Sequence, residues 1–274
     1  MEPGQSIVLG LVQGLTEYLP ISSTAHLRLV PALLGWPDPG AAYSAVVQLG
    51  TLLAVLVYFY RDLWALAVAF CSGLRRGRPF AAPQARLAWI ILLGTVPVGV
   101  FGLVFQHAIE TRLRSLWVVA AALVALALVL AVAEWLGRRH KRMEQLGWAG
   151  GLLIGLAQAL ALIPGASRSG VTITAGLLVG LERTDAARFS FLLGVPAIAA
   201  SGLYELWSLA ESSPTGVPWL AVGLGTAMAA VSGYAAIAFL LRYLQRRSTL
   251  VFIVYRVALG AGIAGLLLGR VLPA

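Results

Sequence analysis

The chain has 274 residues, of which 59% are hydrophobic and only 11% are charged, and its mean hydropathy is +0.87. This composition excludes a water-soluble globular protein and predicts an integral membrane protein. The net charge is +9, but the cations fall in short loops between apolar stretches, and no basic stripe interleaved with aromatic residues indicates nucleic-acid binding.

Two apolar stretches, at residues 6–19 and 148–163, are too short to cross a bilayer. Each ends at a proline, Pro20 or Pro164, and a hydroxyl-rich turn follows. Broken segments at membrane depth are tolerated only where protein buries them or where they line a wet cavity. The pattern therefore predicts two re-entrant helix pairs, whose second helices cover residues 24–34 and 170–181.

Six further stretches are long and apolar enough to span the membrane. They cover residues 41–60, 87–106, 115–136, 187–209, 217–241 and 249–269. Basic residues gather in the connections 61–86 and 137–147 and after residue 241, whereas the connection 211–216 carries none. The positive-inside rule places the basic connections in the cytoplasm, with Arg112 and Arg114 as exceptions on the outer side. We expect a multi-pass protein of the bacterial cytoplasmic membrane.

The two halves of the chain share landmarks at a nearly constant offset of 144 or 145 residues. The pairs are Gln13 with Gln158, Pro20 with Pro164, Ser23 with Ser167, and Gly50 with Gly194. Chance similarity between segments rich in Gly, Leu and Pro is the alternative to a duplication. We predict a single all-α membrane domain, 1–274, with an inverted-topology repeat: residues 1–140 and 145–274 each form a re-entrant pair plus three spans, and the two breaks build a site between them.

Gln13 and Glu17 precede the first break and are four residues apart, so they share a helix face. A carboxylate in an apolar segment costs several kcal/mol unless it is paired, metal-bound or solvated. We therefore expect the Gln13 amide and the Glu17 carboxylate to hold a divalent cation. A protonated or water-facing Glu17 is the alternative.

Hydroxyl groups and a histidine follow the first break. Ser22, Ser23 and Thr24 stand where they can cap the next helix, and His26 lies one turn beyond Ser23. The spacing allows the Ser23 hydroxyl and the His26 imidazole to share a face, as a nucleophile and its base do. A purely structural histidine is the alternative.

The second break is rich in small residues and carries Arg168. The helix that starts near Gly170 points free N–H groups and its positive dipole end at the turn, and a guanidinium matches phosphate oxygens. This pattern predicts anion binding; snorkelling of Arg168, or an ion pair with Glu17, is the alternative. Arg256, inside the last span, is expected in a structural ion pair or in the site.

Together these groups supply the functions that phosphoryl transfer requires. A cation and Arg168 neutralise phosphate charge, Ser23 attacks or orients, and His26 moves a proton. The rival class is a transporter, such as a polyprenyl-phosphate flippase, because broken helices in inverted repeats are typical of carriers. A carrier needs the anion site but no nucleophile beside a base.

Two motifs carry a resemblance to a known family. Gln13-x-x-x-Glu17 with Pro20-x-Ser22-Ser23-Thr24-x-His26, and Pro164-Gly165-x-Ser167-Arg168-Ser169-Gly170-x-Thr172, resemble the signature regions of the bacterial undecaprenyl-pyrophosphate phosphatases, also called bacitracin-resistance proteins. The likeness extends along nearly the whole chain and includes Gln48-Leu49-Gly50, the segment 189–193 and Tyr255-Arg256. Gln13 replaces a glutamate that is common in the family, and Ala25 stands where glycine is common.

The resemblance implies hydrolysis of undecaprenyl pyrophosphate to the monophosphate carrier and inorganic phosphate, which recycles the carrier for peptidoglycan synthesis and confers bacitracin resistance. It further implies a divalent cation, Mg²⁺ or Ca²⁺, and a site open to the periplasm. By position, the catalytic residues are Glu17, Ser23, His26 and Arg168, the metal residues are Gln13 and Glu17, and the phosphate-binding residues are Ser22, Thr24, Ser167, Arg168, Ser169, Gly170 and Thr172.

The sequence leaves several features open. These are attack by Ser23 or by water, the choice of metal, the lipid chain length, flipping of the product, and the oligomeric state, for which a homodimer is one option. A hydrophobic cleft between the repeats is expected to hold the lipid tail.

Overall fold

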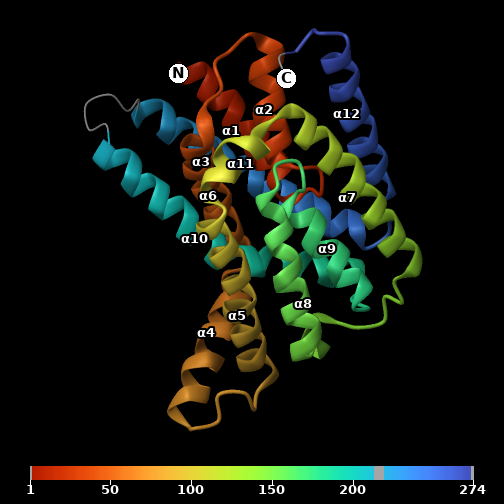
Figure 1. The fold of residues 1–274 in the computed structure, drawn as a ribbon. Coiled ribbons are helices and arrows are strands. Elements are labelled where there is room, and N and C mark those ends of the chain that lie inside the picture. The colour runs from red at the N-terminus through yellow and green to blue at the C-terminus, as the bar shows by residue number, and fades with distance from the viewer. Residues whose placement is uncertain (1, 213–218, 273–274) are drawn as a thin grey trace.

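The computed structural model describes residues 2–212 and 219–272, and no strand occurs within those ranges. Twelve α-helices and three short 3-10 helices make up the described fold (Figure 1). The α-helices are α1 (Pro3–Tyr18), α2 (Ser23–Leu34), α3 (Gly40–Tyr58), α4 (Tyr60–Arg75), α5 (Pro83–Val104), α6 (Gln106–Glu110), α7 (Leu116–Leu136), α8 (Trp148–Gln158), α9 (Arg168–Leu178), α10 (Arg183–Ser212), α11 (Trp219–Leu244) and α12 (Leu250–Leu268); the 3-10 helices are η1 (Arg112–Arg114), η2 (Met143–Gln145) and η3 (Ala159–Leu162).

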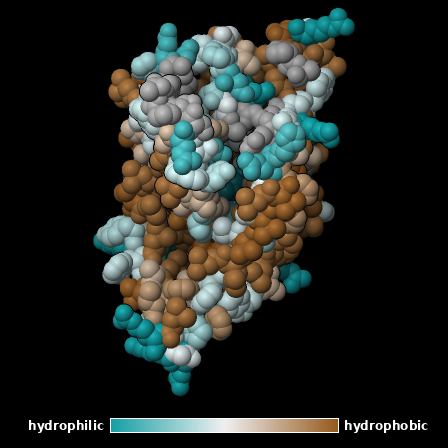
Figure 2. Space-filling view, turned by 60° about the vertical axis from the view of Figure 1, so that its left-hand side comes forward, coloured by the Kyte–Doolittle hydropathy of each residue, from teal (hydrophilic) through white to brown (hydrophobic). Residues whose placement is uncertain are grey.

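The described helices confirm a multi-pass all-α membrane protein. Helices α5, α7, α10, α11 and α12 are each long and apolar enough to cross a bilayer, and α3 with α4 forms a sixth candidate, bent by 79°. On the face shown in Figure 2, apolar residues form a broad band across the middle, and hydrophilic residues gather towards the two ends. The connection expected at 211–216 and the expected span start at residue 217 lie outside the described residues, apart from 211 and 212.

The region expected as a loop at residues 61–86 is largely helical, which corrects the sequence-based expectation. Helix α4 carries Asp62 in its first turn and Arg75 in its last, and both positions favour the helix dipole. One face buries Leu66, whereas Trp64 is exposed. The Arg188 guanidinium of α10 donates to Asp62 at 2.8 Å, which fixes α4 against the bundle. Helices α4 and α5 project together at the bottom of Figure 1.

Glycines allow close crossings between helices of the two halves. A β carbon at Gly10 of α1 would lie 2.2 Å from the carbonyl oxygen of Gly225 in α11. A β carbon at Gly155 of α8 would lie 2.4 Å from Cα of Gly94 in α5. The shorter helices α1 and α8 therefore each pack on a long helix of the opposite half, and Gly10 and Gly155 are equivalent positions at the offset of 145 residues. The inverted orientation of the two halves stays a prediction.

Gly10→Ala should lower the free energy of unfolding by about 1–3 kcal/mol, because the new methyl group meets the backbone of α11, which cannot yield as a flexible side chain can. The measurement is thermal unfolding of the detergent-purified protein. The matched control is Gly223→Ala, in the partner helix α11, since a β carbon at Gly223 meets nothing within 4 Å. Equal unfolding temperatures for the two variants would contradict the close crossing.

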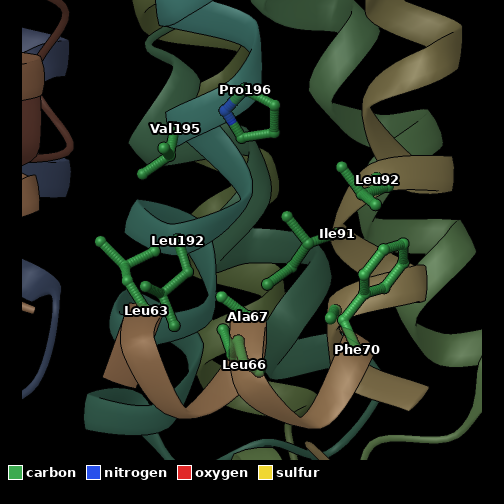
Figure 3. A pocket seen from close by; sticks show the side chains of 10 residues that line it. Leu63, Leu66, Ala67, Phe70, Ile91, Leu92, Leu192, Val195 and Pro196 are labelled. Carbon is green, nitrogen blue, oxygen red and sulfur yellow. The ribbon is translucent and has the colours of Figure 1, made fainter. Parts of the chain in front are cut away.

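An apolar groove of about 260 Å³ lies between α4 and α5 of the first half and α10 of the second (Figure 3). Its lining is entirely hydrophobic: Leu63, Leu66, Ala67, Phe70, Ala88, Ile91, Leu92, Leu192, Val195 and Pro196. The groove thus provides an apolar cleft between the two predicted repeats. Placement of a lipid tail in it stays a prediction.

Candidate active site

The two breaks in the apolar helices lie against each other, although about 145 residues of chain separate them. The Gly165 amide donates to the Thr24 hydroxyl at 3.2 Å, and the Ser169 hydroxyl donates to the Leu19 carbonyl at 3.0 Å. Each bond joins one break to the other. Residues from both predicted repeats therefore form one polar site.

The helices that leave the two breaks begin in the same unusual way. Ser22 and Ser167 are the N-caps, with φ of 74° and 67°, and their hydroxyls accept from the amides of Ala25 and Gly170. Positive φ is uncommon for residues other than glycine, so the backbone is strained at both caps. The structure makes Ser22, rather than Ser23, the counterpart of Ser167. Ser23 and Arg168 consequently occupy equivalent places as the first residues of α2 and α9.

The Glu17 carboxylate is the centre of the site. It is 6% exposed and accepts hydrogen bonds from three side chains. The Ser23 hydroxyl donates to Oε2 at 2.7 Å, and the Gln13 amide nitrogen donates to the same oxygen at 2.8 Å. The Arg168 guanidinium approaches Oε1, with Nη2 at 3.2 Å. The cost of burying this charge is offset by the guanidinium and the hydrogen bonds.

Arg168 points into the site and does not snorkel to an interface. Its Nη1 donates to the Ser190 carbonyl of α10 at 3.1 Å. It also lies so close to Gly194 that a β carbon there would be 1.8 Å from Nη1. The Thr172 hydroxyl shares a 2.6 Å hydrogen bond with the Ser190 hydroxyl and donates to the Arg168 carbonyl at 2.7 Å. Helix α10 thus fixes the guanidinium, so that its Nε and Nη2 stay directed at the Glu17 carboxylate.

Several expected phosphate ligands are engaged within the protein. The Gly170 amide donates to the Ser167 hydroxyl at 3.1 Å, and the Ser167 and Ser169 hydroxyls are 3.3 Å apart. The Ser22 and Thr24 hydroxyls are 3.1 Å apart. In this arrangement these groups shape the two turns, and Arg168 is the residue whose charge is directed at the centre.

His26 does not form the expected pair with Ser23. Its Nδ1 lies 2.7 Å from the Ser22 carbonyl, and its Nε2 lies 2.6 Å from the Tyr255 hydroxyl. The Ser23 hydroxyl instead has Glu17 as its hydrogen-bond acceptor. The sequence indicated Tyr255 only as part of the family resemblance, because a residue 229 positions away leaves no local pattern.

Arg256 of α12 is fully buried beside the second break. Its Nη2 donates to the Ala166 carbonyl at 2.9 Å and to the Gly165 and Ala122 carbonyls at 3.4 Å. No carboxylate of the described chain lies within ion-pair distance of it, which corrects the expected ion pair. Its hydrogen bonds hold the turn from which α9 starts.

Gln13 and Glu17 fit a divalent cation. The Gln13 side-chain oxygen is buried and has no partner, although its nitrogen is bonded to Glu17. An orphaned amide oxygen beside a carboxylate is a suitable pair of hard oxygen ligands, and Mg²⁺ commonly uses one or two carboxylates together with substrate phosphates. Within the described ranges, no cluster of three His, Cys, Asp or Glu residues could hold a metal alone. Phosphate and water oxygens would have to complete the coordination.

The fold and the site define a helical multi-pass membrane protein with a buried, charge-paired polar site where two broken helices meet. The chain belongs to the family of the bacitracin resistance protein BacA, whose model matches residues 6–262.

The curated relatives resemble the chain over nearly its full length. The undecaprenyl-diphosphatase of Chlorobium phaeobacteroides (strain BS1) is 53% identical over 278 residues, with 98% of this chain and 99% of the relative covered. The undecaprenyl-diphosphatase of Myxococcus xanthus (strain DK1622) is 57% identical over 258 residues, with 93% and 86% covered. That of Chlorobaculum tepidum is 51% identical over 278 residues, with 98% and 99% covered.

Proposed function

We propose that the chain is an integral membrane phosphatase that hydrolyses undecaprenyl pyrophosphate to undecaprenyl phosphate and inorganic phosphate. Membership of the BacA family and the similarity to undecaprenyl-diphosphatases that are more than 50% identical support this activity. The observation that carries it is the convergence of the Ser23 hydroxyl and the Arg168 guanidinium on Glu17. A flippase would need the Arg168 guanidinium to bind the lipid phosphate. It would not need the Ser23 hydroxyl bonded to the buried Glu17 carboxylate.

The residues suggest how the reaction proceeds. Arg168 binds the terminal phosphate through the guanidinium N–H groups that Glu17 and the Ser190 carbonyl leave free. Glu17 accepts the proton of the Ser23 hydroxyl as its oxygen attacks phosphorus. The bond from that phosphorus to the bridging oxygen breaks, undecaprenyl phosphate leaves, and water then releases inorganic phosphate from the serine. Direct attack by a water that Glu17 deprotonates gives the same products, and Ser23 then orients the water.

A divalent cation completes the proposed site, held by the Gln13 side-chain oxygen and the Glu17 carboxylate. When bound, it supplies Lewis-acid neutralisation of phosphate charge. Arg168 still binds phosphate, and the Gln13 nitrogen still orients the carboxylate.

A chelator should abolish phosphate release from the wild-type protein, and added Mg²⁺ or Ca²⁺ should restore it. Gln13→Ala should raise the cation concentration needed for half-maximal activity by about tenfold or more, because one of two protein oxygen ligands is lost. Gln13→Glu is the matched variant and should need no more cation than the wild type. Full activity after exhaustive chelation would contradict the cation site.

We propose the cytoplasmic membrane as the location, with the site open to the periplasm and the carrier recycled for peptidoglycan synthesis. The arginine-rich connection between α4 and α5 then faces the cytoplasm, whereas η1, with Arg112, lies at the other end of α5.

Cys71, the single cysteine, gives a direct test of this orientation. It is exposed on α4, one turn before Arg75. A membrane-impermeant maleimide should leave Cys71 unlabelled in intact cells and should label it in inverted membrane vesicles. Labelling in intact cells would reverse the orientation.

The activity itself is tested by identifying both products. Mass spectrometry should find undecaprenyl phosphate in equal molar amount to the inorganic phosphate released from undecaprenyl pyrophosphate by the purified protein. Expression in a bacitracin-sensitive bacterium should also raise bacitracin tolerance. Transport of the intact lipid across proteoliposomes with no phosphate release would support the flippase instead.

A further inference from the structure

His26 is held at both ring nitrogens. The Ser22 carbonyl oxygen is 2.7 Å from Nδ1, and the Tyr255 hydroxyl is 2.6 Å from Nε2. The two rings are nearly parallel, with an interplanar angle of 6° and centroids 5.7 Å apart. Two hydrogen bonds and a ring contact therefore fix both the position and the rotation of the imidazole.

These partners also decide which nitrogen carries the proton. A carbonyl oxygen can only accept, so Nδ1 of His26 must donate to Ser22. The neutral ring then has a lone pair at Nε2, and the Tyr255 hydroxyl is the group that donates to it. The carbonyl of Ser22 is directed by the strained cap of α2, with φ of 74°, whereas the hydroxyl comes from α12 of the other predicted repeat.

Tyr255 is much more exposed than His26. Its side chain is 41% exposed, whereas His26 is 9% exposed. The Ser23 hydroxyl is engaged by Glu17, so Nε2 of His26 is not used to activate Ser23 in this arrangement. Because Nδ1 is bonded to the Ser22 carbonyl, Nε2 is the ring nitrogen left to exchange a proton, and its partner is the Tyr255 hydroxyl.

We infer that Tyr255 is a positioning residue that holds His26 as the Nδ1-protonated tautomer, with Nε2 kept as an acceptor for turnover. This inference rests on the proposed function, to which it adds the proton transfer by His26 that the sequence predicts, but the tautomer can be measured without any activity. Tyr255 thereby couples α12 to the first break, as Arg168 couples α9 to it.

The first test is spectroscopic. Nitrogen-15 NMR of histidine-labelled protein in detergent should show His26 with a protonated Nδ1 and an unprotonated Nε2. The chain has three histidines, and His26→Gln identifies the signal. Tyr255→Phe keeps the ring and removes only the hydroxyl, and it should shift the His26 signals towards the other tautomer or an average of both. Tyr204→Phe, at an exposed tyrosine of α10, should leave them unchanged.

The second test is kinetic. Tyr255→Phe should lower kcat by about tenfold with little change in KM, which is the effect of losing one hydrogen bond of ordinary strength in the transition state. Because Tyr255 acts through His26, the double variant with His26→Gln should be no slower than His26→Gln alone. Thermal unfolding of each variant shows whether it is folded.

Retention of the wild-type tautomer in Tyr255→Phe, or a kcat within twofold of wild type, would overturn the inference. So would an additive loss in the double variant. If the wild-type protein releases no phosphate from a polyprenyl pyrophosphate, the proposed function fails, and the NMR comparison still decides whether Tyr255 positions His26.

Discussion

Arg168→Ala should lower kcat/KM for undecaprenyl pyrophosphate by about 10³-fold. The variant removes the fixed cation that we propose binds phosphate, and loss of one preorganised electrostatic donor costs about 10²–10³-fold in turnover. It also leaves the Glu17 carboxylate buried without its guanidinium, so the free energy of unfolding should fall by about 3–5 kcal/mol. Steady-state phosphate release and chemical unfolding in detergent measure the two effects.

Arg168→Lys separates charge from geometry. Lysine keeps the positive charge but cannot bind Glu17, phosphate and the Ser190 carbonyl with one planar fork. Stability should be largely recovered, whereas turnover should stay well below that of the wild type. A lysine variant with wild-type kcat/KM would show that any cation suffices at this position, and it would remove the geometric role assigned to the guanidinium.

Ser23→Ala should lower kcat by about 10³-fold or more and leave substrate binding nearly unchanged. The hydroxyl bonded to Glu17 at 2.7 Å is the proposed nucleophile or water-orienting group, so its loss affects the reacting atoms and spares the guanidinium that is proposed to bind phosphate. Rapid acid quench with labelled substrate should trap a phosphoserine in the wild type if Ser23 attacks directly. Its absence under conditions that capture other phosphoenzymes favours attack by water.

The matched control is Ser232→Ala. Ser232 is also a buried helical serine, but its hydroxyl donates to the Met228 carbonyl of its own helix, α11. We expect wild-type kcat for this variant. If Ser23→Ala and Ser232→Ala turned over equally fast, Ser23 would have no place in the reaction.

The helices were predictable because the bilayer imposes their length. A span must bury about 20 apolar residues, so five predicted stretches appear as the long helices α5, α7, α10, α11 and α12. Helix α4 was not predicted, because its charged ends and mixed faces resemble a loop in a search for continuous apolar runs. Its stability comes from packing on α5 and from the ion pair between Arg188 and Asp62, and neither contact has a local pattern.

The members of the site were easier to predict than their contacts. Glu17 and Arg168 were evident because charged residues are costly in broken apolar segments. The three-residue spacing of Ser23 and His26 suggested a pair, but that spacing only allows a shared face. The strained cap at Ser22 presents its carbonyl to His26, while the Ser23 hydroxyl meets Glu17. The partnership with Tyr255 depends on the packing of α12, which no short-range pattern encodes.

The central claim is that the two breaks form one catalytic site for a lipid pyrophosphate. Its most direct test is phosphate release from undecaprenyl pyrophosphate by the purified wild-type protein beside Ser23→Ala and Arg168→Ala, with folding checked in each sample. We predict cation-dependent release by the wild type and almost none by either variant, since each removes a group contributed by a different break. Undiminished release by both folded variants would contradict the claim and place the reaction elsewhere in the protein.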